Sequence, residues 1–126
     1  MKATFVETTE FTRAVADFLP DEAYAKLQQR LMVNPDEGKV MPGCGGLRKV
    51  RTADPKRGKG KRGGARVIYL HVPTAKRFYL LDIYGKDEKE DLSAAEKKQL
   101  RQLAEQLKKE AIASYERWLL ENQSWR

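Results

Sequence analysis

The pattern of hydrophobic and polar positions divides the chain into a helical N-terminal part and a later part that opens with strands. Residues 3–6 fit a short strand, and hydrophobic residues then recur at helical spacing over residues 11–19 behind a pair of threonines that can cap a helix. Asp21 is a good cap for a second helix, which should end before Pro35 because the residue preceding a proline avoids helical backbone. We therefore expect two short helices laid as a hairpin on a sheet.

From residue 47 onward the pattern changes to that of strands. Residues 47–51 form a short segment, and residues 65–72 and 77–84 are rich in β-branched and aromatic side chains. Only residues 73–76 separate the last two segments, so we expect these to pair as an antiparallel hairpin. Residues 54–64 offer no hydrophobic side chain suited to a core, which predicts a mobile basic loop between strands.

The clearest local signal is the start of a C-terminal helix. Ser93 and Glu96 have the spacing of a capping box, in which each side chain bonds the backbone N–H of the other residue. A stripe at helical spacing follows, and we expect its first leucines to pack against the sheet. The stripe comprises Leu100, Leu103, Leu107, Ala111, Tyr115, Trp118 and Leu119. Its second half is expected to extend past the sheet, where Trp118 and Trp125 could contact a partner.

Together these elements predict an α+β fold in one domain over residues 1–126, with about 105–126 as a helical extension. The expected architecture is an antiparallel sheet with an N-terminal helical hairpin and a C-terminal helix. No stretch approaches eighteen consecutive hydrophobic residues, and the N-terminal segment alternates with polar residues. We therefore expect a cytoplasmic protein without a membrane partner or a secretory signal.

The net charge of +7 is concentrated in one segment. Nine basic residues and one acidic residue, Asp54, give this segment +8 and leave −1 for the rest of the chain. The nine are Arg48, Lys49, Arg51, Lys56, Arg57, Lys59, Lys61, Arg62 and Arg66. Such a concentration of positive charge attracts polyanions and releases their counterions on binding. A nucleic acid is therefore the expected partner, ahead of a merely solvated loop.

Several other kinds of site fit the residues poorly. The single cysteine, Cys44, excludes an internal disulfide and a multi-cysteine zinc site. The glycine-rich segment lacks the terminal Gly-Lys-Ser/Thr of a phosphate-binding loop and precedes a strand where that motif needs a helix. One histidine and no paired acidic motif argue against a metal-dependent nuclease, and the acidic residues of 87–91 fit a solvated turn before a helix. No metal or cofactor is expected.

The remaining kind of chemistry is cleavage of a phosphodiester with the help of cationic side chains. RNA can be cut without a metal when its own 2′-hydroxyl attacks the adjacent phosphorus, provided that the protein aligns the nucleotides and neutralises charge. An arginine stays charged and forks onto phosphate oxygens, which makes Arg66 a candidate for stabilising the transition state. A lysine among other cations can have a lowered pKa and serve as acid or base. His71 lies five residues after Arg66, on the opposite face of the strand, and is a weak candidate base.

These residues resemble a known family of toxins. GGLRKVR at 45–51, GKGKRGGARVIY at 58–69 and FYLLDIYGKDEKEDLSAAEKKQL at 78–100 are similar to the HigB-type branch of the RelE/ParE superfamily. The segments MKATFVETTEF and LMVNPDEG are similar too, so the resemblance covers nearly the whole chain. It implies a RelE-like fold, ribosome-dependent cleavage of mRNA that inhibits translation and growth, and neutralisation by an antitoxin encoded beside the toxin. Its further partners would be the ribosome with its rRNA and, through the antitoxin, operator DNA.

The resemblance also implies roles for single residues. By position in the Arg-Val-Ile-Tyr strand, Arg66 corresponds to the arginine that stabilises the transition state. Lys49 and Lys86 are the further catalytic candidates. The candidates for binding RNA or the ribosome are Arg48, Arg51, Lys56, Arg57, Lys59, Lys61, Arg62 and Lys89. Where RelE-type toxins often carry an arginine and a tyrosine after the Gly-Lys pair, this chain has Asp87 and Asp91-Leu92, so Lys86 or Lys89 would have to assist proton transfer.

Two other functions remain open from the sequence. ParE-type relatives act on a protein target such as DNA gyrase and do not cut RNA, and a basic domain can also bind RNA without cleaving it. The dense basic segment favours RNA contact over a protein target.

Overall fold

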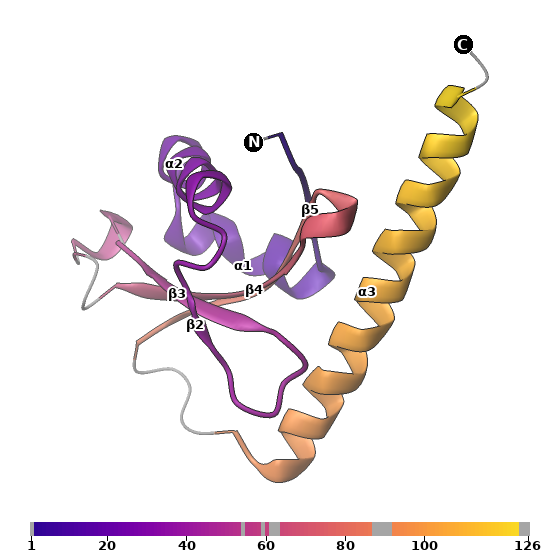
Figure 1. The fold of residues 1–126 in the computed structure, drawn as a ribbon. Helices are drawn as coiled ribbons and strands as arrows, with labels where there is room; N and C mark the ends of the chain where they lie inside the picture. Colours follow the sequence, from indigo (N-terminus) through magenta and orange to yellow (C-terminus); the bar gives the residue numbers. More distant parts are fainter. Residues whose placement is uncertain (1, 54, 59, 61–63, 87–91, 124–126) are drawn as a thin grey trace.

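The computed structural model describes residues 2–53, 55–58, 60, 64–86 and 92–123, and its fold is drawn in Figure 1. The elements in chain order are β1 (Thr4–Glu7), α1 (Thr9–Phe18), α2 (Asp21–Val33), β2 (Lys39–Val40), β3 (Arg48–Thr52), the 3₁₀ turn η1 (Pro55–Arg57), β4 (Ala65–Val72), the 3₁₀ turn η2 (Pro73–Ala75), β5 (Arg77–Gly85) and α3 (Ala94–Gln123). The strands form one sheet in the order β1-β5-β4-β3-β2. The β1–β5 pair is parallel and the other three pairs are antiparallel. The predicted α+β class and its helical hairpin, sheet and C-terminal helix are confirmed.

The helix ends follow the local sequence signals. The Thr8 side chain accepts a hydrogen bond from the Phe11 N–H at 3.2 Å and so caps α1. Asp21, predicted as the cap of α2, is instead its first residue, and Pro20 occupies the cap position; in the first turn the Asp21 carboxylate is still favoured by the helix dipole. At α3 the capping box is confirmed: the N–H of Ser93 donates to Glu96 Oε1 and the N–H of Glu96 donates to Ser93 Oγ, both at 3.1 Å.

One face of the sheet is covered by α1 and α2 (Figure 1). Their hydrophobic side chains form a core with alternate residues of β4 and β5, as expected where one face of a strand is buried. The central members of this core are Phe11, Phe18, Leu27, Leu31, Val67, Tyr69, Phe78 and Leu80.

The opposite face is crossed by α3 through small residues. Ala104 and Ala111 are fully buried, and a Cβ placed on Gly45 would lie 3.1 Å from the Ala104 Cβ. Gly45 belongs to the loop between β2 and β3, so α3 packs closely on this loop, and its alanines, but not all of its leucines, join the core on this face of the sheet. Leu100 and Leu107 are partly buried as predicted, but Leu103 is 36% exposed, so its predicted packing against the sheet is wrong.

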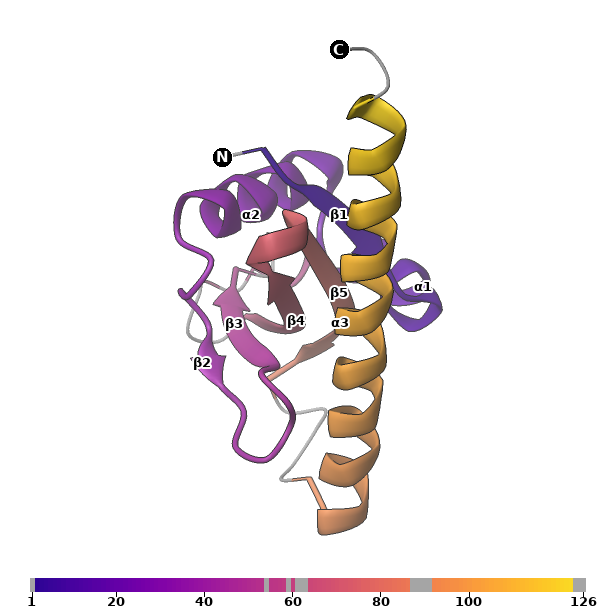
Figure 2. The ribbon, with the colours of Figure 1, turned by 45° about the vertical axis from the view of Figure 1, so that its right-hand side comes forward.

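The last turns of α3 project beyond the sheet (Figure 2). Trp118 is 53% exposed and stacks on Tyr115, and Leu120 is 69% exposed. Trp125 lies outside the described residues. Among the described residues, no helix is long and apolar enough to cross a membrane.

Candidate nucleic-acid interface

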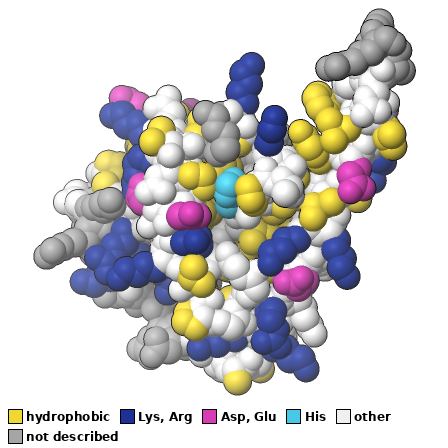
Figure 3. All heavy atoms as spheres, in the orientation of Figure 1, with side chains coloured by type: hydrophobic (Ala, Val, Ile, Leu, Met, Phe, Trp, Pro, Cys, Tyr) yellow, Lys and Arg dark blue, Asp and Glu magenta, His cyan; other side chains and the backbone are white. Residues whose placement is uncertain are grey.

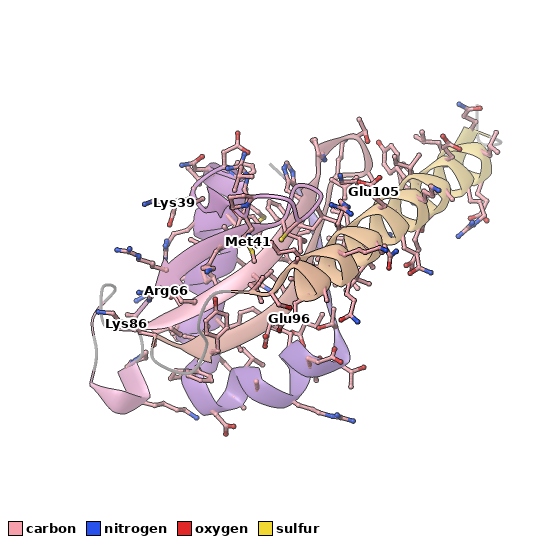
Figure 4. The ribbon with its side chains drawn as sticks, turned by 90° about the horizontal axis from the view of Figure 1, so that it is seen from below. Lys39, Met41, Arg66, Lys86, Glu96 and Glu105 are labelled. Carbon is pink, nitrogen blue, oxygen red and sulfur yellow. The ribbon has the colours of Figure 1, made fainter. Side chains whose placement is uncertain are left out.

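The helix α3 covers only part of the sheet face that it crosses. A groove of about 660 Å³ lies at the end of this face that the helix leaves uncovered. Its floor comes from β3, β4 and β5, one side comes from β2 and the loop after it, and the other side comes from the start of α3. Figure 4 views this end, with Arg66 on the sheet, Lys39 and Met41 along one side and Glu96 on the first turn of α3. The lining residues are Lys39, Val40, Met41, Pro42, Cys44, Lys49, Arg51, Arg66, Ile68, Tyr84, Leu92 and Lys97.

The strand register places the polar side chains of the floor in rows. Arg51 on β3 pairs with Arg66 on β4, which pairs with Tyr84 on β5. In the next row Lys49 pairs with Ile68. Since side chains alternate between the two faces of a sheet, residues at these positions share the face that forms the groove. Three predicted site residues, Arg66, Lys49 and Arg51, are thus brought together.

The groove is electropositive. Five of its lining residues are basic, namely Lys39, Lys49, Arg51, Arg66 and Lys97, and none of the described residues that line it is acidic. Clustered like charges in a concave surface raise the local concentration of an oppositely charged ligand. The Arg66 guanidinium is partly buried, and its Nη1 makes long hydrogen bonds to the carbonyls of Gly64, at 3.4 Å, and Ala65, at 3.3 Å. Its backbone surroundings therefore help to orient it.

A second, smaller groove of about 330 Å³ adjoins the first, and the two share Ile68 and Leu92 as lining residues. Its charge is opposite in sign. Glu10, Asp82 and Glu96 line it, and none of the described residues along it is basic.

Arg48 lies on the other face of the sheet, away from the groove. It pairs with Tyr69, a member of the core beneath α1 and α2. Its guanidinium donates to the Gly38 carbonyl at 2.8 Å and forms an ion pair with Asp36 at 3.3 Å. Its structural partners are therefore in the loop that joins α2 to β2.

Tyr69 holds the same loop from inside the core. Its fully buried hydroxyl donates to the Pro35 carbonyl at 2.6 Å and accepts from the Gly38 N–H at 3.0 Å. Burial raises the pKa of the Tyr69 phenol, so the hydroxyl keeps its proton for this bond. A Cβ on residue 38 would lie 2.8 Å from Tyr69 Cε1, so the contact requires glycine. Through this loop, Tyr69 and Arg48 fix the position of β2.

Of the remaining predicted residues, Lys56 and Lys86 do not line the groove. Lys86 is exposed just beyond β5, at the same end of the sheet as Arg66 (Figure 4). The ammonium of Lys56 donates to the Ala16 carbonyl of α1, and Arg57 belongs to η1. Lys59, Lys61, Arg62 and Lys89 lie outside the described residues.

The structure adds three groove residues that sequence reasoning missed: Lys39, Tyr84 and Lys97. Tyr84 supplies an aromatic hydroxyl next to Arg66, whereas the sequence search looked for a tyrosine only after the Gly-Lys pair. The hairpin connection alone would set Ile83 opposite Arg66, but a register shift between Ile68 and Tyr69 sets Tyr84 there instead. Lys39 and Lys97 could not be found from the sequence either, since they depend on the position of β2 and of α3.

His71 lies on the face opposite Arg66, as predicted. Its ring stacks on Phe78 with centroids 4.4 Å apart, and burial lowers its pKa, which favours the neutral form. It does not line the groove. Among the described residues, no group of three or more His, Cys, Asp or Glu side chains could hold a metal ion.

Compared with known protein families, residues 8–123 match the RelE toxin of the RelE/RelB toxin-antitoxin system. The match extends from the cap of α1 to the end of α3 and leaves out only β1 and the chain ends. The two N-terminal helices, the sheet and the long C-terminal helix are consistent with this assignment. The chain therefore belongs to the RelE family, and is the toxin of a type II toxin-antitoxin pair with a cognate antitoxin as its partner.

Proposed function

We propose that the protein is a cytoplasmic, ribosome-dependent endoribonuclease that cleaves translated mRNA without a metal ion and thereby inhibits translation and growth. The observation that carries this proposal is the row of Arg51, Arg66 and Tyr84 on three adjacent strands, in a groove with five basic lining residues. Resemblance of the chain to the HigB-type branch supports the same activity. The charge of the groove favours RNA over a protein target such as gyrase.

The proposed reaction is attack by the message's own 2′-hydroxyl. The 2′-oxygen forms a bond to phosphorus, the bond from phosphorus to the 5′-oxygen breaks, and the products are a 2′,3′-cyclic phosphate and a 5′-hydroxyl. Arg66 neutralises the charge that develops on the phosphoryl oxygens, and Arg51 holds the adjacent backbone. Lys49, Tyr84 and Lys86 are the candidates for taking the proton from the 2′-hydroxyl and protonating the leaving 5′-oxygen.

Dependence on the ribosome has a physical rationale. The groove is open, its described lining residues include neither a carboxylate nor a histidine, and the single histidine lies on the far face. Charge neutralisation and alignment must then supply most of the rate acceleration. The contribution of alignment is larger when the message is already held rigidly. A message fixed in the ribosome meets that requirement, whereas free RNA does not.

The decisive variant is Arg66→Ala, with Arg117→Ala on the projecting part of α3 as the matched control. Loss of a transition-state donor should lower the cleavage rate by about 10²–10³-fold, while folding and antitoxin binding persist. The measurement is mapping of mRNA 5′ ends after induction, together with cleavage by purified protein on ribosomes carrying a defined message.

Two further readouts test the chemistry. Cleavage should continue in the presence of a chelator of transition metals, and the upstream fragment should end in a 2′,3′-cyclic or 3′-phosphate. A message with 2′-deoxy at the cut position should resist cleavage. Cutting of the deoxy message, or an Arg66→Ala variant as active as Arg117→Ala, would refute the mechanism.

A further inference from the structure

The chemistry of the groove changes along its length. At one end lies the row of Arg51, Arg66 and Tyr84. Toward α3 the lining becomes mostly hydrophobic, with Ile68 on the floor and Leu92 just before the helix, and Lys97 on the helix is the basic residue there. On the β2 side the hydrophobic lining is Met41, Pro42 and Cys44. The Met41 N–H donates to the Leu47 carbonyl at 2.9 Å, which places Met41 beyond the Lys49 row, on the side away from Arg51.

A nucleotide has the same two-part character as this groove. Its phosphate is anionic, whereas the faces of its base are apolar and pack against aromatic or aliphatic side chains. The groove volume of about 660 Å³ lies within the range of about 300–1,000 Å³ that encloses small-molecule ligands. A phosphate at the Arg66 row would leave the attached base within reach of the hydrophobic end.

Leu92 and Ile68 separate this hydrophobic end from the second groove. Ile68 is 4% exposed within β4, whereas Leu92 is only partly buried and directly precedes the capping box of α3. Beyond them lie the carboxylates of Glu10 and Asp82, which would repel an RNA backbone. The size of the side chain at position 92 thus sets the depth of the hydrophobic end. The same side chain shields this end from the acidic groove.

We propose that the hydrophobic end of the groove is a nucleobase pocket and that Leu92 is a specificity-determining residue, which decides which base is accepted beside the cleaved phosphate. The proposal rests on the proposed function, because it assigns the base-reading part of that same site. Arg66 and its neighbours act on the phosphate of any nucleotide, and Leu92 with Met41 discriminates between bases by fit.

The test compares Leu92→Ala, which deepens the pocket, with Leu92→Phe, which fills it. The matched control is Leu103→Ala, since Leu103 lines the second groove but not the first. Cleavage sites are mapped on the same set of translated messages. In both Leu92 variants the ratio of cleavage at preferred over disfavoured bases should change by about tenfold or more, the scale at which a hydrophobic pocket discriminates by one or a few methylene groups. Leu103→Ala should keep the wild-type ratio.

A second measurement does not depend on cleavage. Equilibrium binding to the purified protein is compared for 2′-deoxy-blocked trinucleotides with a base and with an abasic central position. The wild type should bind the base-bearing form more tightly, and Leu92→Ala should reduce that difference. Equal binding of the two forms, or Leu92 variants that slow all sites by the same factor, would overturn the pocket. A wild type that prefers the base but never cuts RNA would uphold the pocket and refute the proposed nuclease.

Discussion

Tyr69 connects the hydrophobic core to one side of the groove. Its ring packs among core residues beneath α1 and α2, while its hydroxyl bonds two backbone groups of the loop before β2. Buried polar groups that lose a partner are costly, since water does not replace it. A residue that does not line the groove can therefore influence it by holding Lys39 in place.

Exchanging Tyr69 for phenylalanine should show this effect on stability. The Pro35 carbonyl and the Gly38 N–H would lose their partner, and the free energy of unfolding should fall by about 1–3 kcal/mol. Denaturant titration should show a lower midpoint with an unchanged slope. In the control variant Tyr115→Phe, on α3, the free energy of unfolding should change by no more than about 0.5 kcal/mol. Equal midpoints for the two variants would contradict the role given to the Tyr69 hydroxyl.

At the scale of single residues, the sequence identified the right residue types but could not assign each of them to a face of the sheet. Arg48 and Arg51 both belong to the basic segment, and only the register shows that Arg51 faces the groove while Arg48 pairs with Tyr69 on the other side. Arg66 could be singled out early because its strand was evident from its own pattern. Tyr84 was overlooked because its role depends on the strand beside it, not on its neighbours in sequence.

Among the elements, α3 shows how close packing depends on small residues. The helix meets the sheet through Ala104 and Ala111, and Gly45 lies against it where a larger residue would collide. A periodic stripe of leucines shows that a helix is amphipathic, but it does not show which of its residues lie nearest the sheet. The prediction for Leu103 failed for this reason.

Leu103 and Ala104, neighbouring residues of α3, should respond differently to substitution. Leu103→Ala should destabilise the protein by less than the ~2–5 kcal/mol typical of a buried leucine, since this side chain is already 36% exposed. Ala104→Leu should cost about 1–3 kcal/mol, because added volume forces α3 away from Gly45. Thermal or denaturant unfolding of the two variants measures both effects. A larger loss for Leu103→Ala than for Ala104→Leu would mean that the helix packs in another orientation.

The elements with strong local signals were predicted almost to the residue. These are β4, β5, the end of α2 and the start of α3, whose capping residues and hairpin connection are encoded nearby in sequence. The two-residue β2 is too short to leave a pattern. The parallel pairing of β1 with β5 joins segments that are distant in sequence, so no local rule reveals it.

For the molecule as a whole, the positive charge is unevenly distributed. In the view of Figure 3, many Lys and Arg side chains gather on the side where β3 ends and η1 follows. The described basic residues of the segment 48–66 belong to β3, η1 and β4. This distribution suits a long polyanion that follows one side of the protein and enters the groove from it.

Salt dependence measures how many of these charges meet RNA phosphates. For single-stranded RNA the slope of log affinity against log salt should be about −0.7 for each phosphate neutralised. Replacing Lys59, Lys61 and Arg62 together by glutamine should flatten the slope by about 2 if all three contact the backbone. The control exchanges Lys26, Lys109 and Arg117, which gives the same change in net charge on α2 and α3. An equal slope in both triple variants would show that the loop is merely solvated.

The order of the strands also has a consequence for synthesis. β1 emerges from the ribosome before β5, the strand with which it pairs, and Thr4 lies opposite Arg77. The groove needs β3, β4 and β5 and also Leu92 and Lys97, so most of the chain must emerge before it exists. Because a domain of this kind folds as a unit, we expect the nascent chain to lack a working site until the start of α3 with Lys97 has emerged. If the protein acts as proposed, an unfinished chain therefore cannot cleave the message from which it is being made.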